Sequence, residues 1–200
     1  MEIIKSISYF QDEIISNILK LYSPNGKIDL DPTYSKGVFY KNIEKPKYKF
    51  DLFPQTKDTI KADCKNLPVK NNSIGCMILD LPFLISSGPS LKIKKCGSNI
   101  ISSRFSCFKT VNDLRKTYEL SIKESYRILN KKGILILKCQ DTVSGGKNYF
   151  IHNEIYNMTL NAGFYVKDLF ILLAKSRILG NIKKQVHARK FHSYFIVMEK

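Results

Sequence analysis

Four aspartates stand in short polar turns, each directly after or close behind an apolar stretch of the chain. They are Asp31, Asp51, Asp63 and Asp80. A single aspartate at a strand end is commonly a turn or helix-capping residue, so each one alone indicates little. Four in succession favour a shared site, because open α/β sheets bind their ligands at the carboxyl ends of the strands. Carboxylates at that edge can accept hydrogen bonds from amino and hydroxyl groups of a ligand.

Other kinds of chemistry lack their residues in this sequence. It contains neither a G-x-x-x-x-G-K-[ST] segment for nucleoside triphosphates nor a G-x-G-x-x-G segment for dinucleotides. The five cysteines include no pair at C-x-x-C spacing, and His187 and His192 stand in a basic stretch. These patterns predict free thiols in a reducing cytoplasm and no metal centre.

Hydrophobic periodicity predicts the elements that position the acidic turns. Helical stripes alternate with short apolar runs, which indicates an α/β sheet. The first helix ends before Gly26, and the clearest helix is capped by Asn112 and followed by a turn at Gly133. The expected helices are 11–22, 112–129 and 152–162, and the expected strands are 27–30, 48–53, 74–79, 134–137, 164–174 and 193–198.

The chain is long enough for one domain, residues 1–200, that buries a core without disulfides. Its net charge of +16 favours a polyanionic partner. Two basic stretches, 86–111 and 175–192, are expected as insertions over the site, although solvated surface loops would have the same composition. The residues expected to contact nucleic acid are Lys92, Lys94, Lys95, Arg104, Lys183, Lys184, His187, Arg189, Lys190 and His192.

The acidic turns resemble motifs of the class I S-adenosylmethionine-dependent methyltransferases that modify exocyclic amines of bases, in particular the small phage-type DNA methylases. Segment 31–37 (DPTYSKG) is similar to the first cofactor motif of that family. Segment 80–83 (DLPF) is similar to its catalytic [DNS]-P-P-[YFW] tetrad. Segments 126–133 and 187–194 resemble later motifs, so the resemblance extends from about residue 27 onward.

The resemblance implies a Rossmann-like sheet that is mostly parallel, with an antiparallel last strand and helices on both faces. It implies S-adenosylmethionine as cofactor, with Asp51 at the ribose hydroxyls and Asp63 at the adenine amine. Three positions depart from the family pattern: Gly37 is the one glycine of the first motif, Gly75 replaces an acid, and Leu81 replaces a proline. The implied cofactor-binding residues are Asp31, Pro32, Thr33, Tyr34, Gly37, Asp51, Asp63 and Cys64.

The implied catalytic residues are Asp80, Leu81, Pro82 and Phe83, and they suit a weak nucleophile. The lone pair of an exocyclic amine is delocalised into the base. A site that accepts both N–H hydrogens in fixed directions makes the nitrogen more pyramidal and aims its lone pair at the methyl group. Asp80 can accept one N–H, and the carbonyl of residue 81 the other, whatever its side chain. Pro82 stiffens the turn, and Phe83 offers a face on which the base can stack.

The leading hypothesis is an N6-adenine DNA methyltransferase without a separate recognition domain, with cytosine N4 as the runner-up target. RNA is the alternative acceptor, and a nucleic-acid-binding subunit of the same fold without catalysis is the alternative outside enzymes. C5 methylation of cytosine is disfavoured, because no cysteine follows a proline. The sequence contains no run of about 18 apolar residues, which a membrane-spanning helix would need, so we expect a cytoplasmic protein. Without a separate recognition domain, its sequence specificity could come from a protein partner.

Overall fold

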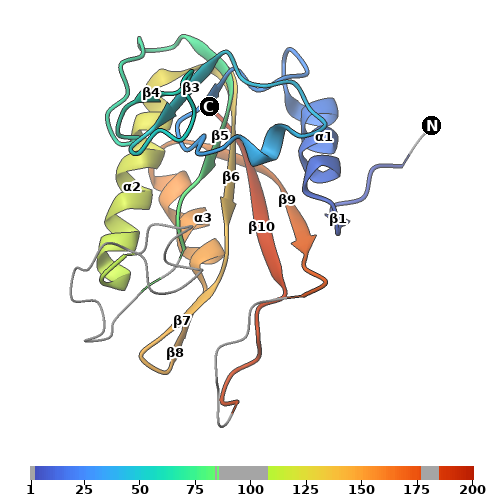
Figure 1. Ribbon diagram of the computed structural model, residues 1–200, viewed down its shortest axis with the longest axis vertical. Coiled ribbons are helices and arrows are strands. Elements are labelled where there is room, and N and C mark those ends of the chain that lie inside the picture. Colours follow the sequence, from blue (N-terminus) through green and yellow to red (C-terminus); the bar gives the residue numbers. More distant parts are fainter. Residues whose placement is uncertain (1–2, 84, 86–107, 177–184) are drawn as a thin grey trace.

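The computed structural model describes residues 3–83, 85, 108–176 and 185–200. At its centre lies an eight-stranded sheet in the order β1-β9-β10-β6-β5-β2-β3-β4 (Figure 1). β7 (Thr142–Ser144) and β8 (Lys147–Tyr149) form a separate hairpin. The strands of the main sheet are β1 (Ile7–Ser8), β2 (Leu30–Asp31), β3 (Tyr48–Asp51), β4 (Ile60–Lys61), β5 (Ile74–Asp80), β6 (Leu129–Cys139), β9 (Tyr165–Leu173) and β10 (His192–Glu199).

The sheet confirms the predicted fold class. Its neighbouring strands are parallel except at β10, which runs antiparallel to both β6 and β9. Helix α1 (Gln11–Tyr22) and the short η1 (Val38–Tyr40) pack on one face. Helices α2 (Val111–Ile128) and α3 (Ile151–Asn161) cover the other. None of the described helices is long and apolar enough to cross a membrane.

The apolar stripes form two separate cores, one for each face of the sheet. Ile14, Ile15 and Ile18 of α1 are fully buried against alternate residues of β5 and β6, among them Ile78 and Ile136. On the other face, the α2 stripe of Leu114, Tyr118 and Ile122 is buried against Leu79 and Leu137. Successive strand residues point to opposite faces, so the continuous apolar runs of β5 and β6 supply both cores.

Several expected boundaries are wrong. β2 is only Leu30–Asp31, so Asp31 ends the strand instead of following it. β6 begins at Leu129, directly after α2, and Gly133 lies inside this strand. Gly133 is required there by a close approach and not by a turn, because an added Cβ would lie 2.8 Å from the carbonyl oxygen of Asn130. β1 and β4 have two residues each, too few for a periodic pattern to predict.

The topology brings the acidic turns to one edge of the sheet. β5, β2, β3 and β4 are consecutive parallel neighbours, so their carboxyl ends lie side by side. Asp80, Asp31 and Asp51 end the first three of these strands, and Asp63 follows the fourth by two residues. The predicted alignment of four aspartates is therefore present in this order along the edge.

The start of α2 differs from the prediction and provides a stability test. Its N-cap is Thr110, not Asn112, and its capping box joins the Thr110 hydroxyl to the N–H of Asp113 at 3.1 Å. Thr110→Ala should lower the free energy of unfolding by about 1 kcal/mol, because an orphan N–H loses its acceptor. Thr110→Ser keeps the hydroxyl and should stay close to wild type. Urea unfolding measures both, and equal stability of Thr110→Ala and wild type would contradict this cap.

Candidate active site at the carboxyl edge

A hydrogen-bond network joins the first acidic turn to the tetrad. Asp31 is buried, and its carboxylate accepts hydrogen bonds from the N–H of Thr33 at 2.8 Å, the Thr33 hydroxyl at 3.0 Å and the Tyr40 hydroxyl at 2.8 Å. The same Thr33 oxygen accepts the backbone N–H of Asp80 at 3.0 Å. Thr33 therefore fixes the distance between two segments that the sequence separates by 47 residues.

Burial dominates the electrostatics of Asp31. It raises the pKa of this carboxyl to about 7, although the hydrogen bonds from Thr33 and Tyr40 act in the opposite direction. Burial also raises the pKa of Tyr40 far above its usual value, and the neighbouring Asp31 adds to that effect. The Asp31 side chain is thus an internal support of the edge, out of reach of a ligand that stays in solvent.

The segment after Asp31 folds tightly over its own tyrosine. Tyr34 is buried and stacks on Tyr40 with ring centroids 5.4 Å apart. Gly37 has a positive φ of 67°, and a Cβ there would lie 2.5 Å from the Tyr34 hydroxyl oxygen. Both conditions exclude a side chain, so the one glycine of this motif is needed for the loop to close.

The loop and the second acidic turn are in direct contact. The N–H of Ser35, which also has a positive φ, donates to Asp51 at 2.8 Å. The other oxygen of Asp51 accepts the N–H of Phe53 at 2.8 Å. Each carboxylate oxygen can accept a further hydrogen bond, and Asp51 is partly exposed. The Asp51 carboxylate is therefore fixed in position and can still accept hydrogen bonds from a ligand.

The third acidic turn presents a second such carboxylate. Asp63 accepts the N–H of Lys65 at 3.0 Å and forms an ion pair with the Lys65 ammonium at 3.3 Å. The thiol of Cys64 lies 3.3 Å from the Ser121 hydroxyl of α2 and 3.9 Å from an oxygen of Asp63, and burial raises its pKa. The Cys64 side chain thus joins the third acidic turn to α2. Two partly exposed carboxylates beside a tight glycine loop suit a ligand with hydroxyl and amino donors.

The tetrad lies at the end of β5. The side chain of Leu81 is buried in the core beneath α2, whereas Pro82 and Phe83 are partly exposed. The Asp80 carboxylate is paired with Lys138 of β6, whose ammonium nitrogen lies 3.2 Å from an oxygen of Asp80. With the Leu81 side chain turned inward, the polar group that this residue can offer is its backbone carbonyl.

Lys138, which holds Asp80, was not among the predicted site residues. Its ammonium also donates to the side-chain oxygen of Gln11 at 3.0 Å, which links the first residue of α1 to the site. Lys138 and Asp80 are paired residues in the β5–β6 register. The available signal was a lysine closing the apolar run ILILK, where a buried strand admits a charge only beside a partner.

A second polar cluster was also missed. Asp141, two residues beyond β6, is buried and lies 2.7 Å from Nδ1 of His152 at the start of α3. The Tyr194 ring stacks on His152 at 4.3 Å, and its hydroxyl lies 2.9 Å from Nε2 of His192. No sequence spacing indicates this cluster, because its members come from the loop after β6, from α3 and from β10. Within the described part of the chain, no three His, Cys, Asp or Glu side chains are grouped to hold a metal ion.

The predicted nucleic-acid contacts divide into two groups. His187 lies against the β7–β8 hairpin, with Nε2 2.8 Å from the carbonyl oxygen of Gly146. Arg189 is exposed, and the backbone carbonyls of Lys190 and His192 accept hydrogen bonds from the amide of Gln140. Six of the predicted residues lie outside the described part of the chain, which omits 86–107 and 177–184: Lys92, Lys94, Lys95, Arg104, Lys183 and Lys184.

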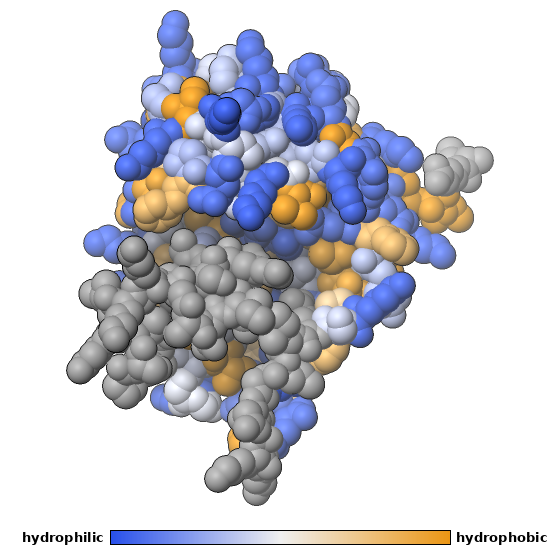
Figure 2. Space-filling view, in the orientation of Figure 1, coloured by the Kyte–Doolittle hydropathy of each residue, from blue (hydrophilic) through white to orange (hydrophobic). Residues whose placement is uncertain are grey.

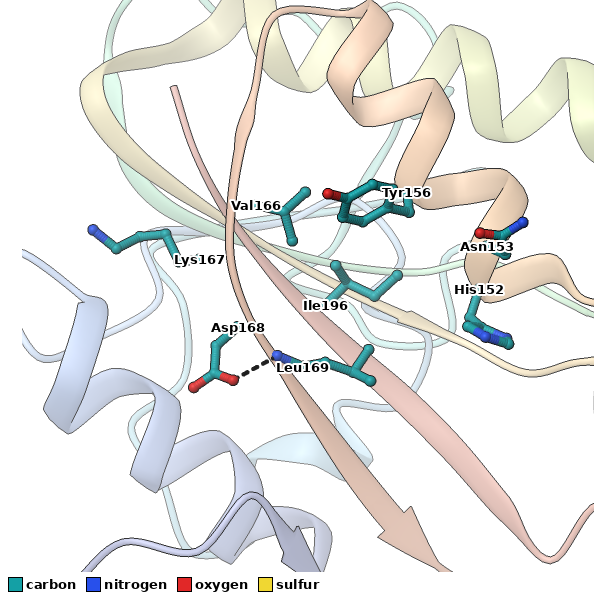
Figure 3. Close-up of a pocket in the computed structure, with 8 residues that line it drawn as sticks. All are labelled: His152, Asn153, Tyr156, Val166, Lys167, Asp168, Leu169 and Ile196. Carbon is teal, nitrogen blue, oxygen red and sulfur yellow. Dashed lines mark hydrogen bonds between the residues drawn. The ribbon is translucent and has the colours of Figure 1, made fainter.

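A cavity of about 420 Å³ lies elsewhere, between α3 and the strands β9 and β10 (Figure 3). Tyr156, Val166 and Leu169 give it apolar walls. Its charged residues already have partners: Asp168 accepts from the Tyr22 hydroxyl at 2.6 Å, and Lys167 pairs with Glu199 at 2.8 Å. His152 and Asn153 also line it, and His152 is already bound to the Asp141 carboxylate, so the carboxyl edge with its two partly exposed carboxylates remains the candidate site.

Comparisons with known proteins support this description at the level of the fold. No protein-family model and no curated protein matches the chain. Among solved structures, the [4+2]-cyclase SpnF is 14% identical over 80% of this chain and 60% of its own, with a TM-score of 0.51. A SAM-dependent methyltransferase from Thermotoga maritima is 16% identical over 92% of this chain and 86% of its own, with a TM-score of 0.48.

A candidate DNA modification methylase from Thermus thermophilus, complexed with S-adenosyl-L-methionine, is 14% identical over 70% of this chain and 53% of its own. Its TM-score is 0.48. This chain thus spans about half the length of the Thermus protein. The likeness to SpnF, whose TM-score exceeds 0.5, concerns the fold alone.

The raised pKa of Asp31 predicts how stability depends on pH. The folded protein holds a proton on Asp31 up to about pH 7, whereas the unfolded chain releases it near the ordinary pKa of 3.8. The stability that wild type gains over Asp31→Asn should therefore fall as pH rises from 5 to 7, with a slope approaching about 1.4 kcal/mol per pH unit. Urea unfolding at several pH values measures this difference.

Asp58→Asn is the matched control. A hydrogen bond from Lys49 lowers the pKa of the exposed Asp58 to about 2, so its contribution is present above the unfolded pKa and is lost only as pH falls through the acid range. Between pH 5 and 8, the difference between wild type and Asp58→Asn should stay constant. A constant difference for Asp31→Asn as well would show that Asp31 is ionised when folded.

Proposed function

We propose that this protein transfers a methyl group from S-adenosylmethionine to an exocyclic amino group of a nucleic-acid base. The main product is N6-methyladenine in DNA. The observation that carries the proposal is the Thr33 bridge between Asp31 and the N–H of Asp80. It joins the segment that resembles the first cofactor motif to the segment that resembles the catalytic tetrad. Methyl transfer needs these two parts within reach of one another.

Asp51 and Asp63 are proposed to hold the cofactor, which supplies a methyl group on a positively charged sulfur. The Asp51 carboxylate, fixed by Ser35 and Phe53, would accept the ribose hydroxyls. Asp63, one strand further along the edge, would accept the adenine amine. Gly37 lets the segment between Asp31 and Asp51 close over Tyr34, because a Cβ there would lie 2.5 Å from the Tyr34 hydroxyl oxygen.

Asp80 and Leu81 are proposed to orient the amine of the target base. The Asp80 carboxylate accepts one N–H, and the carbonyl of Leu81 accepts the other. Lys138 keeps the carboxylate in place from the side of β6, so it acts as a positioning residue. Phe83, which is partly exposed, stacks on the base. The residues provide orientation and hydrogen-bond acceptors, and no covalent bond to the protein is needed.

The preference for adenine and for DNA rests on the resemblance and on charge. The tetrad opens with an acid, as is usual for adenine targets in the resembling families, where serine accompanies cytosine N4 more often. The charge of +16 suits a polyanion, and Arg189 and Lys190 stand at the end of the sheet where β10 begins. An adenine within a duplex would have to be flipped out of the stack.

Incubation with methyl-labelled cofactor and either DNA or RNA, followed by mass spectrometry of the digested nucleosides, tests the function directly. N6-methyladenine in DNA is the expected product. N4-methylcytosine would correct the base, and label in RNA alone would correct the acceptor. Cofactor binding without transfer to either polymer would favour the non-catalytic subunit.

Asp51→Ala should weaken cofactor binding. Losing a carboxylate that accepts ribose hydroxyls should weaken the binding free energy of the cofactor by roughly 1.5–3 kcal/mol, which raises Kd about 10-fold to 150-fold. Calorimetric titration with S-adenosylmethionine measures this change. Glu119→Ala, which removes an exposed carboxylate on α2, is the control and should bind as wild type does. Equal affinity of Asp51→Ala and wild type would remove Asp51 from the site.

Asp80→Ala should abolish most methyl transfer and spare cofactor binding. The substitution removes one of the two acceptors that orient the amine, and the loss of such a contact lowers the rate on the order of 10²-fold or more. Calorimetry and single-turnover methylation measure the two properties separately. If Asp80→Ala methylates as fast as wild type, the tetrad is only a turn and the catalytic assignment is wrong.

A further inference from the structure

Two adjacent aromatic side chains, Tyr9 and Phe10, stand exposed where β1 leads into α1. They are 53% and 60% exposed, and together they form a larger exposed apolar surface than a single side chain would. The ammonium of Lys175 lies 5.7 Å from the Tyr9 centroid and 5.6 Å from the Phe10 centroid. The three side chains form one cluster, which we call the aromatic rim.

The backbone beneath the rim is anchored. The N–H of Phe10 donates to the Ser8 hydroxyl at 3.0 Å, and that hydroxyl donates to Glu13 of α1. β1 pairs in parallel with β9 through Ile7 and Ile171. The rings therefore project from a fixed segment, so their exposure does not come from a loose end of the chain.

Phe10 also occupies a position where another residue type would stabilise the helix. It is the N-cap of α1 and makes no side-chain capping bond. Ser, Thr, Asp or Asn at an N-cap contributes about 1 kcal/mol to stability. A large exposed ring here forgoes that stabilisation and is not buried in return, which points to a contact with something outside the chain.

The rim adjoins the candidate active site. Gln11, the residue after Phe10, accepts a hydrogen bond from Lys138, and Lys138 is paired with Asp80. On its other side, Ala174 donates its N–H to the carbonyl of Phe191, one step beyond the β9–β10 ladder. Lys175 and Lys190 flank that pair, so the rim is continuous with the basic residues that precede β10.

We propose that Tyr9, Phe10 and Lys175 bind an unpaired stretch of nucleic acid next to the target base, with a base stacked on the rings and Lys175 at the backbone phosphate. The inference rests on the proposed function and adds a substrate-binding surface to it. Aromatic faces stack on any base, and a nearby cation binds the phosphate that follows. The net charge of the chain favours such a ligand over an apolar or basic partner surface.

Fluorescence anisotropy with a labelled single-stranded oligodeoxynucleotide tests the rim without any methyl transfer. Tyr9→Leu with Phe10→Leu keeps apolar bulk but removes both rings, and should weaken binding by about tenfold or more. Phe10→Trp keeps a ring and should bind as wild type does. Tyr165→Leu is the matched control, because Tyr165 is 68% exposed at the opposite end of β9. Thermal unfolding of each variant verifies that it is folded.

Lys175→Gln separates charge from stacking. Losing one phosphate contact should lower the slope of log Kd against log salt concentration by about 1. The double leucine variant should leave that slope unchanged, because it removes no charge. An RNA oligonucleotide of the same sequence should show the same loss with the leucine variant, because stacking does not distinguish the sugars. Wild-type affinity in both the leucine variant and Lys175→Gln would overturn the proposal, and so would an equal loss in Tyr165→Leu.

The rim and the proposed function can fail separately. Loss of oligonucleotide binding in the leucine variant, in a protein whose wild type methylates no base, would support the rim and contradict the methyltransferase function. Methylation by wild type together with unchanged binding and KM in the leucine variant would support the function and contradict the rim.

Discussion

The arrangement of the carboxyl edge depends on how the buried Asp31 carboxylate is satisfied. A buried carboxylate needs hydrogen-bond donors, and Asp31 takes them from Thr33 and Tyr40. The Thr33 hydroxyl is then oriented so that its oxygen faces the N–H of Asp80. Tyr40 is pulled inward and becomes the surface on which Tyr34 stacks. The Asp31 side chain therefore connects three parts of the structure: the loop from Thr33 to Gly37, the segment that begins at Asp80, and the core beneath α1.

The remaining parts of the site follow from short strands at this end of the sheet. β2, β3 and β4 have two to four residues each, and the connections between them in the described structure are mainly turns and loops. Loops of this kind keep their shape through specific hydrogen bonds instead of helix packing. The contacts of Asp51 with Ser35 and Phe53 have this role, and the surface over these strands is mainly hydrophilic in Figure 2.

The long elements with a clear apolar periodicity could be predicted from the sequence. Side chains of the site whose hydrogen-bond or ion-pair partners lie far away in the sequence could not. α1 matches its expected bounds, because its apolar spacing and its Pro-Asn-Gly ending are local signals. The four acidic turns were also found, since Asp31 and Asp80 stand at the ends of apolar runs and Asp51 and Asp63 match the resembling family in order. Lys138, Tyr40 and the Asp141–His152 pair were not, because their partners come from distant segments. The Thr110 cap was missed because Asn112 offers an equally good capping residue two positions later.

The position of β10 has a consequence for how the chain acquires its structure. β10 is the last strand in the sequence, yet it lies between β6 and β9 and pairs with both along most of its length. Until it is in place, β9 and β1 have no connection to the rest of the sheet. The pairing of β10 with β6 joins residues that are far apart in the sequence, such as Tyr194 and Cys139, so it is expected to form slowly. Until β10 is paired, the edges of β6 and β9 are open to other chains, which makes the partly folded protein more prone to aggregation than the folded one.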